Sequence, residues 1–277
     1  MAFSVGRLRS TFEEFDAFSD RLMKEHIAKK TVPSDGPDDD HTKDDFIDVL
    51  LRLQQDRSLD FEFTDDQLKA MIQDMFVAGI ETSSVTSEWL MVELVRNPRV
   101  MRKAQEEVRR IVGPKGKVEM KDLSEMVYFK YVAKETMRLH PPAPFLLPRV
   151  TTKSVKLGGY DIPAKVQVLI NAWAVQRDPS FWDQPEEFIP ERFENSSIDF
   201  NSQDFQLIPF GFGRRRCPGL AFGIASVEYL ITNLLYCFDW KLPNNGGLPK
   251  DMDMTEVYGI TVHKKNPLHV VPMLYSP

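Results

Sequence analysis

Apolar residues recur at helical spacing through the first part of the chain, which predicts a mainly helical protein. Near the N-terminus this pattern predicts an amphipathic helix. Its apolar positions are Leu8, Phe12, Phe15, Leu22 and Ile27. Residues 33–45 are polar and rich in proline and aspartate, so a solvated connector is expected there. Apolar positions resume between Phe46 and Leu53 and predict a short second helix.

A long central helix is predicted over about residues 64–97. The stretch "TDDQ" from Thr64 to Gln67 has the form of a capping box, and the apolar pattern stops only at Asn97, before Pro98. Proline is favoured at a first helical position, so Pro98 is expected to begin another helix that ends at the following "GPKG". A further helix should end at His140, because the sequence "HPPAP" cannot continue it.

The periodicity changes to two in the second half of the chain. Residues 155–175 predict a hairpin with a Gly158-Gly159 turn, followed by a half-buried strand. Residues 258–272 predict a second hairpin that closes the chain. No repeat and no convincing linker is present, so the expected architecture is mostly α with small β-sheets, in a single domain over residues 1–277.

Composition narrows the possible functions. The chain has 277 residues, of which 42% are hydrophobic, and a net charge of −6 with both signs interspersed; this argues against nucleic acid as the main partner. Two cysteines exclude a disulfide scaffold. The first residues become charged before an apolar stretch develops, so no signal peptide is expected. Residues 219–238 are long enough to span a bilayer, but Glu228, Thr232 and Asn233 interrupt them; a buried core helix is predicted, with a bilayer span as the alternative.

One stretch carries candidate chemistry, "FGFGRRRCPGL" from Phe210 to Leu220. Helix N-termini and neighbouring cations favour the thiolate form of a cysteine, which is the form that binds metals. Gly211 and Gly213 permit positive φ angles. No second cysteine or histidine stands at zinc-like spacing from Cys217, so one thiolate suits a metal with its own equatorial ligands, such as a haem. The alternative is a helix-capping loop with a buried cysteine.

Five stretches in order resemble the motifs of the cytochrome P-450 superfamily. Phe210–Gly219 resembles its haem-thiolate signature, and "AGIET" at 78–82 resembles the oxygen-activating motif of its long central helix. "ETMR" at 135–138 resembles its Glu-x-x-Arg pair, and "PERF" at 190–193 supplies the arginine that completes that triad. "PPAPFLLPR" ends at Arg149, where the family commonly places a propionate-binding arginine. The chain is similar to plant microsomal members of specialised metabolism.

The resemblance implies a haem b (iron protoporphyrin IX) cofactor with Cys217 as axial ligand and Arg215 and Arg149 at the propionates. Other implied cofactor-binding positions are Phe210, Gly213, Gly219 and Gly79. Thr82 and Glu81 are the implied catalytic residues, with the Thr82 hydroxyl able to bond the carbonyl of Ala78. Glu135, Arg138 and Arg192 are implied to form a buried structural triad that holds the cysteine loop. The implied substrate pocket consists of Phe76, Ala78, Ala143, Phe145, Leu146, Tyr258 and Ile260.

The implied reaction is a monooxygenation of a hydrophobic small molecule by O2, with electrons from NADPH through a separate reductase. By resemblance the expected location is the cytosolic face of the endoplasmic reticulum membrane. The family's membrane anchor, proline-rich hinge and first helices do not precede the matching motifs here. The expectation is therefore a fold of this family whose N-terminal part is missing, and the alternative function is a truncated, non-catalytic fragment. His140, His263 and His269 have no partners at ligand spacing and are expected to be ordinary residues, and Cys237 is expected to be a packed apolar residue.

Overall fold

The computed structural model describes residues 2–30, 44–56, 59–201, 203–243, 249–259 and 261–276. The chain divides into two compact units, Met1–Ile80 and Glu81–Pro277. The predicted connector at 33–45 falls almost wholly outside the described residues, and a single domain over 1–277 stays a prediction.

The first unit is helical. It contains α1 (Ala2–Lys30), α2 (Phe46–Asp56) and the beginning of α3 (Asp65–Arg96). Its core consists of Met23, Leu50, Leu51, Leu68 and Ile72. The predicted capping box is present, because the Gln67 side chain accepts from the Thr64 amide at 3.0 Å and the Thr64 hydroxyl accepts from the Gln67 amide at 3.3 Å.

The predicted apolar face of the first helix is wrong in three positions. Leu8, Phe12 and Ile27 are exposed. The buried side chains of α1 are instead Ser19, Met23 and His26. The α1 residue in the core of the first unit is Met23, which packs with residues of α2 and of the start of α3; the helical spacing alone could not indicate which part of α1 would be covered.

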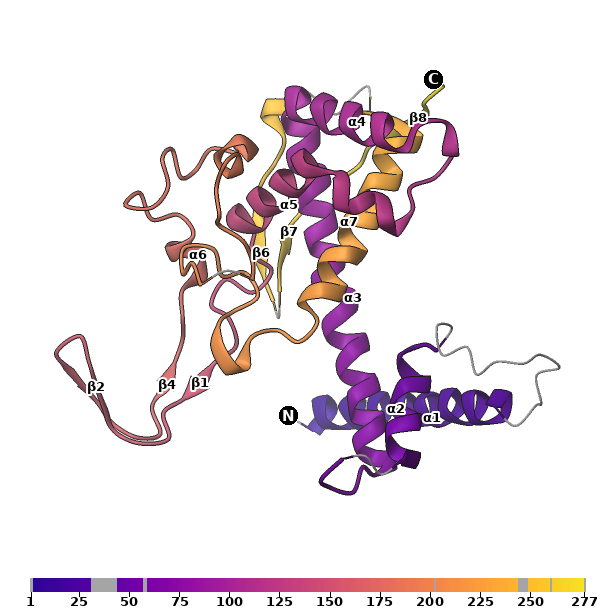
Figure 1. Ribbon diagram of the computed structural model, residues 1–277. Helices are drawn as coiled ribbons and strands as arrows, with labels where there is room; N and C mark the ends of the chain where they lie inside the picture. Colours follow the sequence, from indigo (N-terminus) through magenta and orange to yellow (C-terminus); the bar gives the residue numbers. More distant parts are fainter. Residues whose placement is uncertain are drawn as a thin grey trace. The chain divides into compact units, whose positions relative to one another are not determined.

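In the second unit, the rest of α3 runs beside α4 (Pro98–Val112), α5 (Val127–Leu139) and α7 (Leu220–Cys237) (Figure 1). Together they enclose one hydrophobic core, with members such as Leu90, Val108, Phe129, Ile231 and Leu235. The first amides of α5, those of Tyr128 and Phe129, donate to the Glu107 carboxylate at 2.9 and 2.8 Å. A carboxylate at this end of a helix satisfies its free amides and opposes its dipole.

Four antiparallel strand pairs complete the second unit. β1 (Arg149–Val150) pairs with β4 (Gln167–Val168), β2 (Val155–Leu157) with β3 (Tyr160–Ile162), β5 (Phe238–Lys241) with β8 (Val271–Leu274), and β6 (Glu256–Tyr258) with β7 (Val262–Lys264). The predicted Gly158-Gly159 turn is confirmed, with φ of 58° and 86°. Short helices α6 (Ala172–Val175) and η4 (Pro190–Phe193) interrupt the irregular segment between β4 and the cysteine loop.

Two strand predictions need correction. The strand expected after the first hairpin is limited to β4, because the chain turns at Asn171 into α6, where the Asn171 side chain accepts from the Ala174 amide at 3.0 Å. The closing hairpin is formed by β6 and β7 only. β8 pairs with β5 at the end of α7, a partner distant in the sequence.

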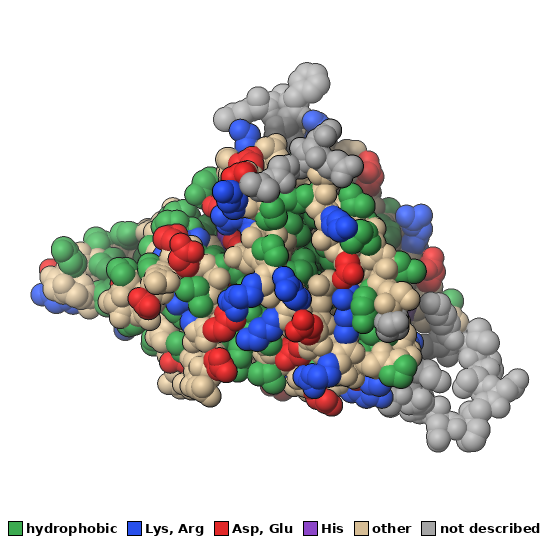
Figure 2. Space-filling view, turned by 90° about the horizontal axis from the view of Figure 1, so that it is seen from above, with side chains coloured by type: hydrophobic (Ala, Val, Ile, Leu, Met, Phe, Trp, Pro, Cys, Tyr) green, Lys and Arg blue, Asp and Glu red, His purple; other side chains and the backbone are tan. Residues whose placement is uncertain are grey.

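Helix α7 has two apolar faces. It is the one described helix that is long and apolar enough to cross a membrane. One face carries Leu220, Val227, Ile231 and Leu235 into the core, whereas Phe222 on another face is 60% exposed. The prediction of a buried core helix therefore holds for one face only. Elsewhere on the surface, basic and acidic side chains are interspersed over the face in Figure 2, as the sequence pattern predicted.

Candidate active site

The loop before α7 presents Cys217. The Cys217 amide donates to the Phe210 carbonyl at 2.9 Å, which closes the loop, and the Phe210 ring packs edge-on against Phe200 in the core. Gly211 and Gly213 have φ of 72° and 74°, a region in which a side chain would be strained. Cys217 lies three residues before α7 and its side chain is exposed. The loop thus holds a cysteine at the surface on a rigidly anchored backbone.

The cations of this loop have no acidic partner among the described residues. None of Arg214, Arg215 and Arg216 forms an ion pair with a described Asp or Glu. Arg216 donates instead to the Asn201 side chain. Arg149, on β1, donates to the Arg215 carbonyl at 3.1 Å, so the structure brings two of the predicted propionate-binding arginines together.

The triad residues lie together in the interior of the second unit. Arg138 makes a two-pronged ion pair with Glu135, at 2.8 and 2.9 Å, and Arg192 donates to the same carboxylate at 2.9 Å. Glu135 and Arg138 are fully buried. The remaining Arg138 donors bond the carbonyls of Gln176, Pro185 and Glu187. All five N–H groups of Arg138 are therefore used.

Gln176 connects this network to the cysteine loop. Its carbonyl accepts from Arg138, and its side-chain amide donates to the carbonyls of Met137 and Arg138, each at 3.0 Å. Its side-chain oxygen accepts from the Ile208 amide at 2.8 Å, two residues before Phe210. No sequence signal indicates the role of Gln176, because nothing near it in the chain indicates its partners.

On α3, Glu81 of the "AGIET" stretch is bonded to the turn of the β6–β7 hairpin. The Thr261 hydroxyl donates to the Glu81 carboxylate at 2.7 Å. The carbonyl of Thr82 accepts from the Thr86 hydroxyl at 2.8 Å. A bond from the Thr82 hydroxyl to Ala78 stays a prediction. No atom lies within 4 Å of a Cβ built on Gly79, so a side chain there would meet open space.

His140 was predicted to be ordinary, but it occupies a polar junction. Its Nε2 lies 2.8 Å from the Glu93 carboxylate and its Nδ1 lies 3.4 Å from that of Glu256. Its ring stacks on Trp89, with 4.0 Å between ring centres. His140 therefore connects the end of α5 to α3 and to β6. No sequence signal revealed this, because both carboxylates are distant in the chain.

The predicted substrate residues are distributed over both units. Phe76 packs edge-on against Phe15 and Phe18 in the first unit. The others described are Ala78 in the first unit and Ala143, Phe145, Leu146 and Tyr258 in the second. A Cβ built on Gly211 would lie 3.9 Å from the Leu146 side chain, so this residue reaches the cysteine loop. Ile260 lies outside the described residues.

The donor chemistry at Cys217 fits a haem. Within the described residues, Cys217 belongs to no group of His, Cys, Asp or Glu side chains that could hold a bare metal ion. A metal bound there needs other ligands, such as the four nitrogens of a porphyrin. The arginines without acidic partners suit carboxylate groups, which guanidinium binds with two parallel hydrogen bonds.

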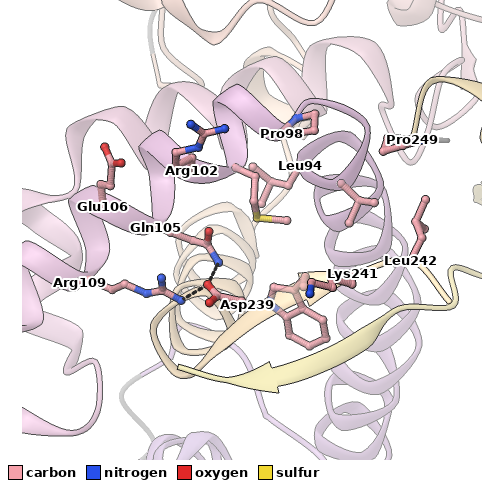
Figure 3. A pocket seen from close by; sticks show the side chains of 13 residues that line it. Leu94, Pro98, Arg102, Gln105, Glu106, Arg109, Asp239, Lys241, Leu242 and Pro249 are labelled. Carbon is pink, nitrogen blue, oxygen red and sulfur yellow. Dashed lines mark hydrogen bonds and ion pairs between the residues drawn. The ribbon is translucent and has the colours of Figure 1, made fainter. Parts of the chain in front are cut away.

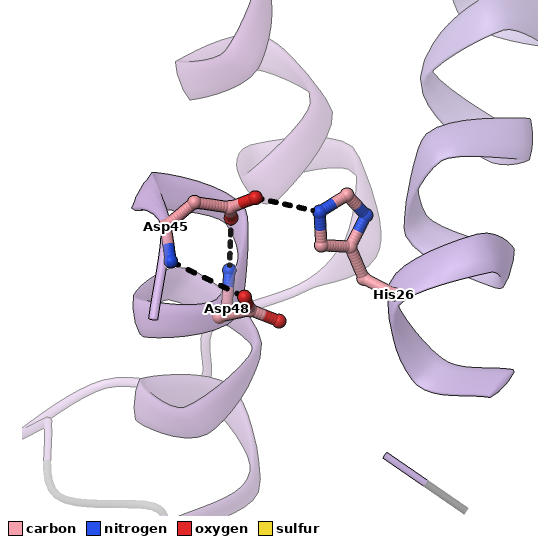
Figure 4. A group of neighbouring side chains, drawn as sticks. All are labelled: His26, Asp45 and Asp48. Carbon is pink, nitrogen blue, oxygen red and sulfur yellow. Dashed lines mark hydrogen bonds and ion pairs between the residues drawn. The ribbon is translucent and has the colours of Figure 1, made fainter. Parts of the chain in front are cut away.

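A separate candidate metal group lies in the first unit, where His26, Asp45 and Asp48 are neighbours (Figure 4). Both His26 nitrogens are already used, by the Leu22 carbonyl at 2.7 Å and by Asp45 at 2.8 Å. Burial disfavours the charged imidazole, but these two hydrogen bonds outweigh it and raise the pKa of His26. Asp45 also accepts from the amides of Ile47 and Asp48 at the start of α2. The group is explained by helix capping.

A surface groove of about 640 Å³ lies between the end of α3, α4 and β5 (Figure 3). Arg109 and Gln105 on its wall donate to the Asp239 carboxylate at 2.9 and 3.4 Å. None of the predicted site residues lines this groove. The groove is therefore a feature distinct from the cysteine loop.

The fold agrees with comparisons to known proteins. The family model described as Cytochrome P450 matches residues 3–271. The chain belongs to the cytochrome P450 family. It is 57% identical to phenylacetaldehyde oxime monooxygenase CYP71AN24 of Prunus mume and 54% identical to cytochrome P450 71A1 of Persea americana, over 98% and 96% of this chain. A zebra fish cytochrome P450 solved with progesterone superimposes with a TM-score of 0.78 at 29% identity, over 98% of this chain and 59% of that one.

These relationships confirm the predicted family and the mostly helical cytochrome P450 fold. The chain spans about half the length of the curated relatives it matches, 50% of the Prunus protein and 52% of the Persea protein. The family implies a haem cofactor. What the whole protein acts on is therefore a matter for proposal.

Proposed function

We propose that this chain carries the haem-thiolate centre of a plant monooxygenase that inserts one oxygen atom of O2 into a hydrophobic small molecule. The observation that carries the proposal is the cysteine loop, anchored through the Cys217 amide and Phe210 carbonyl, in a chain that matches the cytochrome P450 family. The second oxygen atom leaves as water, and the two electrons required come from NADPH through a separate reductase.

Cys217 is the residue that would bind the iron of haem b. When bound, the haem supplies oxygen activation, and donation from the thiolate favours cleavage of the O–O bond. Arg149 and Arg215 bind the propionates. Phe210, Gly213, Gly219 and Gly79 are the other residues that would contact the cofactor. Glu135, Arg138 and Arg192 keep the cysteine loop in place through Gln176.

Glu81 and Thr82 are proposed to deliver the protons that water formation consumes. A carboxylate next to a hydroxyl provides two groups that can hold and pass a proton. Glu81 is exposed on α3 and already accepts a hydrogen bond from a hydroxyl. These features support a role in moving protons from solvent.

The proposed substrate is an apolar or aromatic specialised metabolite. The residues assigned to the pocket are Phe76, Ala78, Ala143, Phe145, Leu146, Tyr258 and Ile260, most of them apolar. The Prunus relative is named for an aromatic oxime, which makes phenylacetaldehyde oxime a suitable first probe. The proposed setting is the cytosolic face of the endoplasmic reticulum membrane, where a reductase can reach the enzyme.

The test is the spectrum of the reduced, carbon monoxide-treated protein. The purified chain should take up haem and give the long-wavelength Soret band of thiolate ligation. Cys217→Ser should abolish this band, whereas Cys237→Ser, at the other end of α7, should retain it. Equal spectra for the two variants would refute the ligand assignment. A chain that takes up no haem would support the alternative, a non-catalytic fragment.

A further inference from the structure

The hydrogen bond between Thr261 and Glu81 joins two elements that the proposed function treats separately. The Thr261 hydroxyl donates to Oε1 of Glu81 at 2.7 Å. The Thr261 residue is 2% exposed, whereas Glu81 is exposed. A buried hydroxyl requires a partner, and a hydrogen bond to a carboxylate is about twice as strong as one between neutral groups. Within the part of the chain that the structure describes, no other side chain donates to Glu81.

The hairpin that carries Thr261 is attached to the segment after α5 at both of its ends. The Val262 amide donates to the Pro142 carbonyl at 3.0 Å, and Glu256 lies 3.4 Å from His140. At the turn, the Gly259 amide donates to the Thr261 carbonyl at 3.0 Å. The Val262 bond lies in the pair next to the turn and the Glu256 contact lies at the open end of the hairpin. Among the described residues, the bond to Glu81 adds a side-chain contact to α3 at the turn.

The same hairpin carries Tyr258, which is 71% exposed and is one of the proposed substrate contacts. Tyr258 pairs with Val262 across the hairpin, so it is adjacent to Thr261 in the strand register. Tyr258 and the bond to Glu81 therefore lie at the same end of the hairpin.

We propose that Thr261 is a positioning residue that holds the Glu81 carboxylate and couples the placement of the substrate hairpin to proton delivery. This rests on the proposed function for the proton role of Glu81 and for the substrate contact of Tyr258. Thr261 acts through Glu81, and does not itself touch the reacting groups.

Hydrogen exchange of this chain tests the coupling without any cofactor. The variants are Thr261→Val, which removes the hydroxyl at nearly constant shape, Thr261→Ser, which retains it, and Glu81→Gln. Loss of a charged hydrogen bond should speed exchange of the 256–265 peptide by about tenfold or more in Thr261→Val. The α4 peptide 98–112 should be unchanged. Thr255→Val, an exposed threonine on the same hairpin, is the matched control.

The expected result is that Thr261→Val has a smaller effect once Glu81→Gln is present, because a glutamine oxygen accepts a weaker hydrogen bond than a carboxylate does. Thr261→Ser should restore slow exchange, and Thr255→Val should be additive with Glu81→Gln. Additive effects of Thr261→Val and Glu81→Gln, or a serine variant that behaves like valine, would overturn the inference. These outcomes do not depend on haem uptake.

A second measurement separates the inference from the proposed function. In the haem-loaded chain supplied with reductase, NADPH and phenylacetaldehyde oxime, the peroxide released per NADPH should rise severalfold in both Thr261→Val and Glu81→Gln. An effect of Glu81→Gln that Thr261→Val does not reproduce overturns the inference alone. No effect of Glu81→Gln overturns the proton role of Glu81 and the inference with it.

Discussion

A buried acid on α7 gives a prediction whose size follows from the structure. Glu228 is 8% exposed on the core-facing side of α7, and within the described residues its carboxylate has no hydrogen-bond partner. Burial raises its pKa from 4.5 to about 7; Lys130 opposes this shift and Asp199 adds to it. The folded protein therefore holds this proton more tightly than the unfolded chain does.

The sign and size of the effect follow from linkage. The pKa of Glu228 in the folded protein lies above its pKa in the unfolded chain. The contribution of Glu228 to the free energy of unfolding is therefore largest below about pH 4.5, falls as the pH rises to about 7, and is constant above that. A shift of 2.5 units, from 4.5 to 7, corresponds to about 3 kcal/mol at 1.36 kcal/mol per unit. Glu228→Gln removes this titration, so its advantage over the native protein should grow by about 2–3 kcal/mol between pH 5 and pH 8.5.

The assay is urea unfolding followed by tryptophan fluorescence at the two pH values. The four tryptophans are Trp89, Trp173, Trp182 and Trp240, all in the Glu81–Pro277 unit, so the signal reports the unit that contains Glu228. The difference between variant and native protein cancels other titrating groups. Glu106→Gln, an exposed carboxylate on α4, is the control and should change stability by under about 0.5 kcal/mol at both pH values. An advantage of Glu228→Gln that is equal at both pH values would refute the reasoning.

Two further predictions concern the triad and α3. Glu135→Ala removes a carboxylate that accepts from Arg138, Arg192 and the Ile189 amide, and it leaves buried charge unpaired. The substitution should lower the free energy of unfolding by about 3–5 kcal/mol and yield little folded, haem-loaded protein. Glu106→Ala should load haem normally. Equal haem occupancy of the two variants would contradict the importance of the triad. Thr82→Ala should divert reductant from product to peroxide, measured as peroxide per NADPH, and unchanged coupling would leave Thr82 with a structural role only.

The helix boundaries were predictable because their signals are local. The capping box at Thr64, the proline at Pro98 and the prolines after His140 each act on the backbone within one turn, and the corresponding helices begin or end there. The cysteine loop was predictable for the same reason, since its glycines and Cys217 lie in one short stretch.

Contacts between distant segments were not predictable from one sequence. His140 acquires its role from Glu93 and Glu256, which lie 47 and 116 positions away. Gln176 meets the Ile208 amide across 32 positions. The outward face of α1 was misjudged on the same grounds, because periodicity identifies an apolar stripe but not which part of it another segment covers.

The way Arg138 is satisfied has a consequence for how this segment can vary between related proteins. Three of its five hydrogen bonds go to main-chain carbonyls of Gln176, Pro185 and Glu187. Every residue type offers such a carbonyl, so the side chains at 185 and 187 can change while the path of the backbone is retained. Arg138 itself has no such freedom, because a lysine brings three donors on a single nitrogen and cannot serve five acceptors in a plane. Substitutions at positions 185 and 187 should therefore be tolerated, whereas substitution of Arg138 should not.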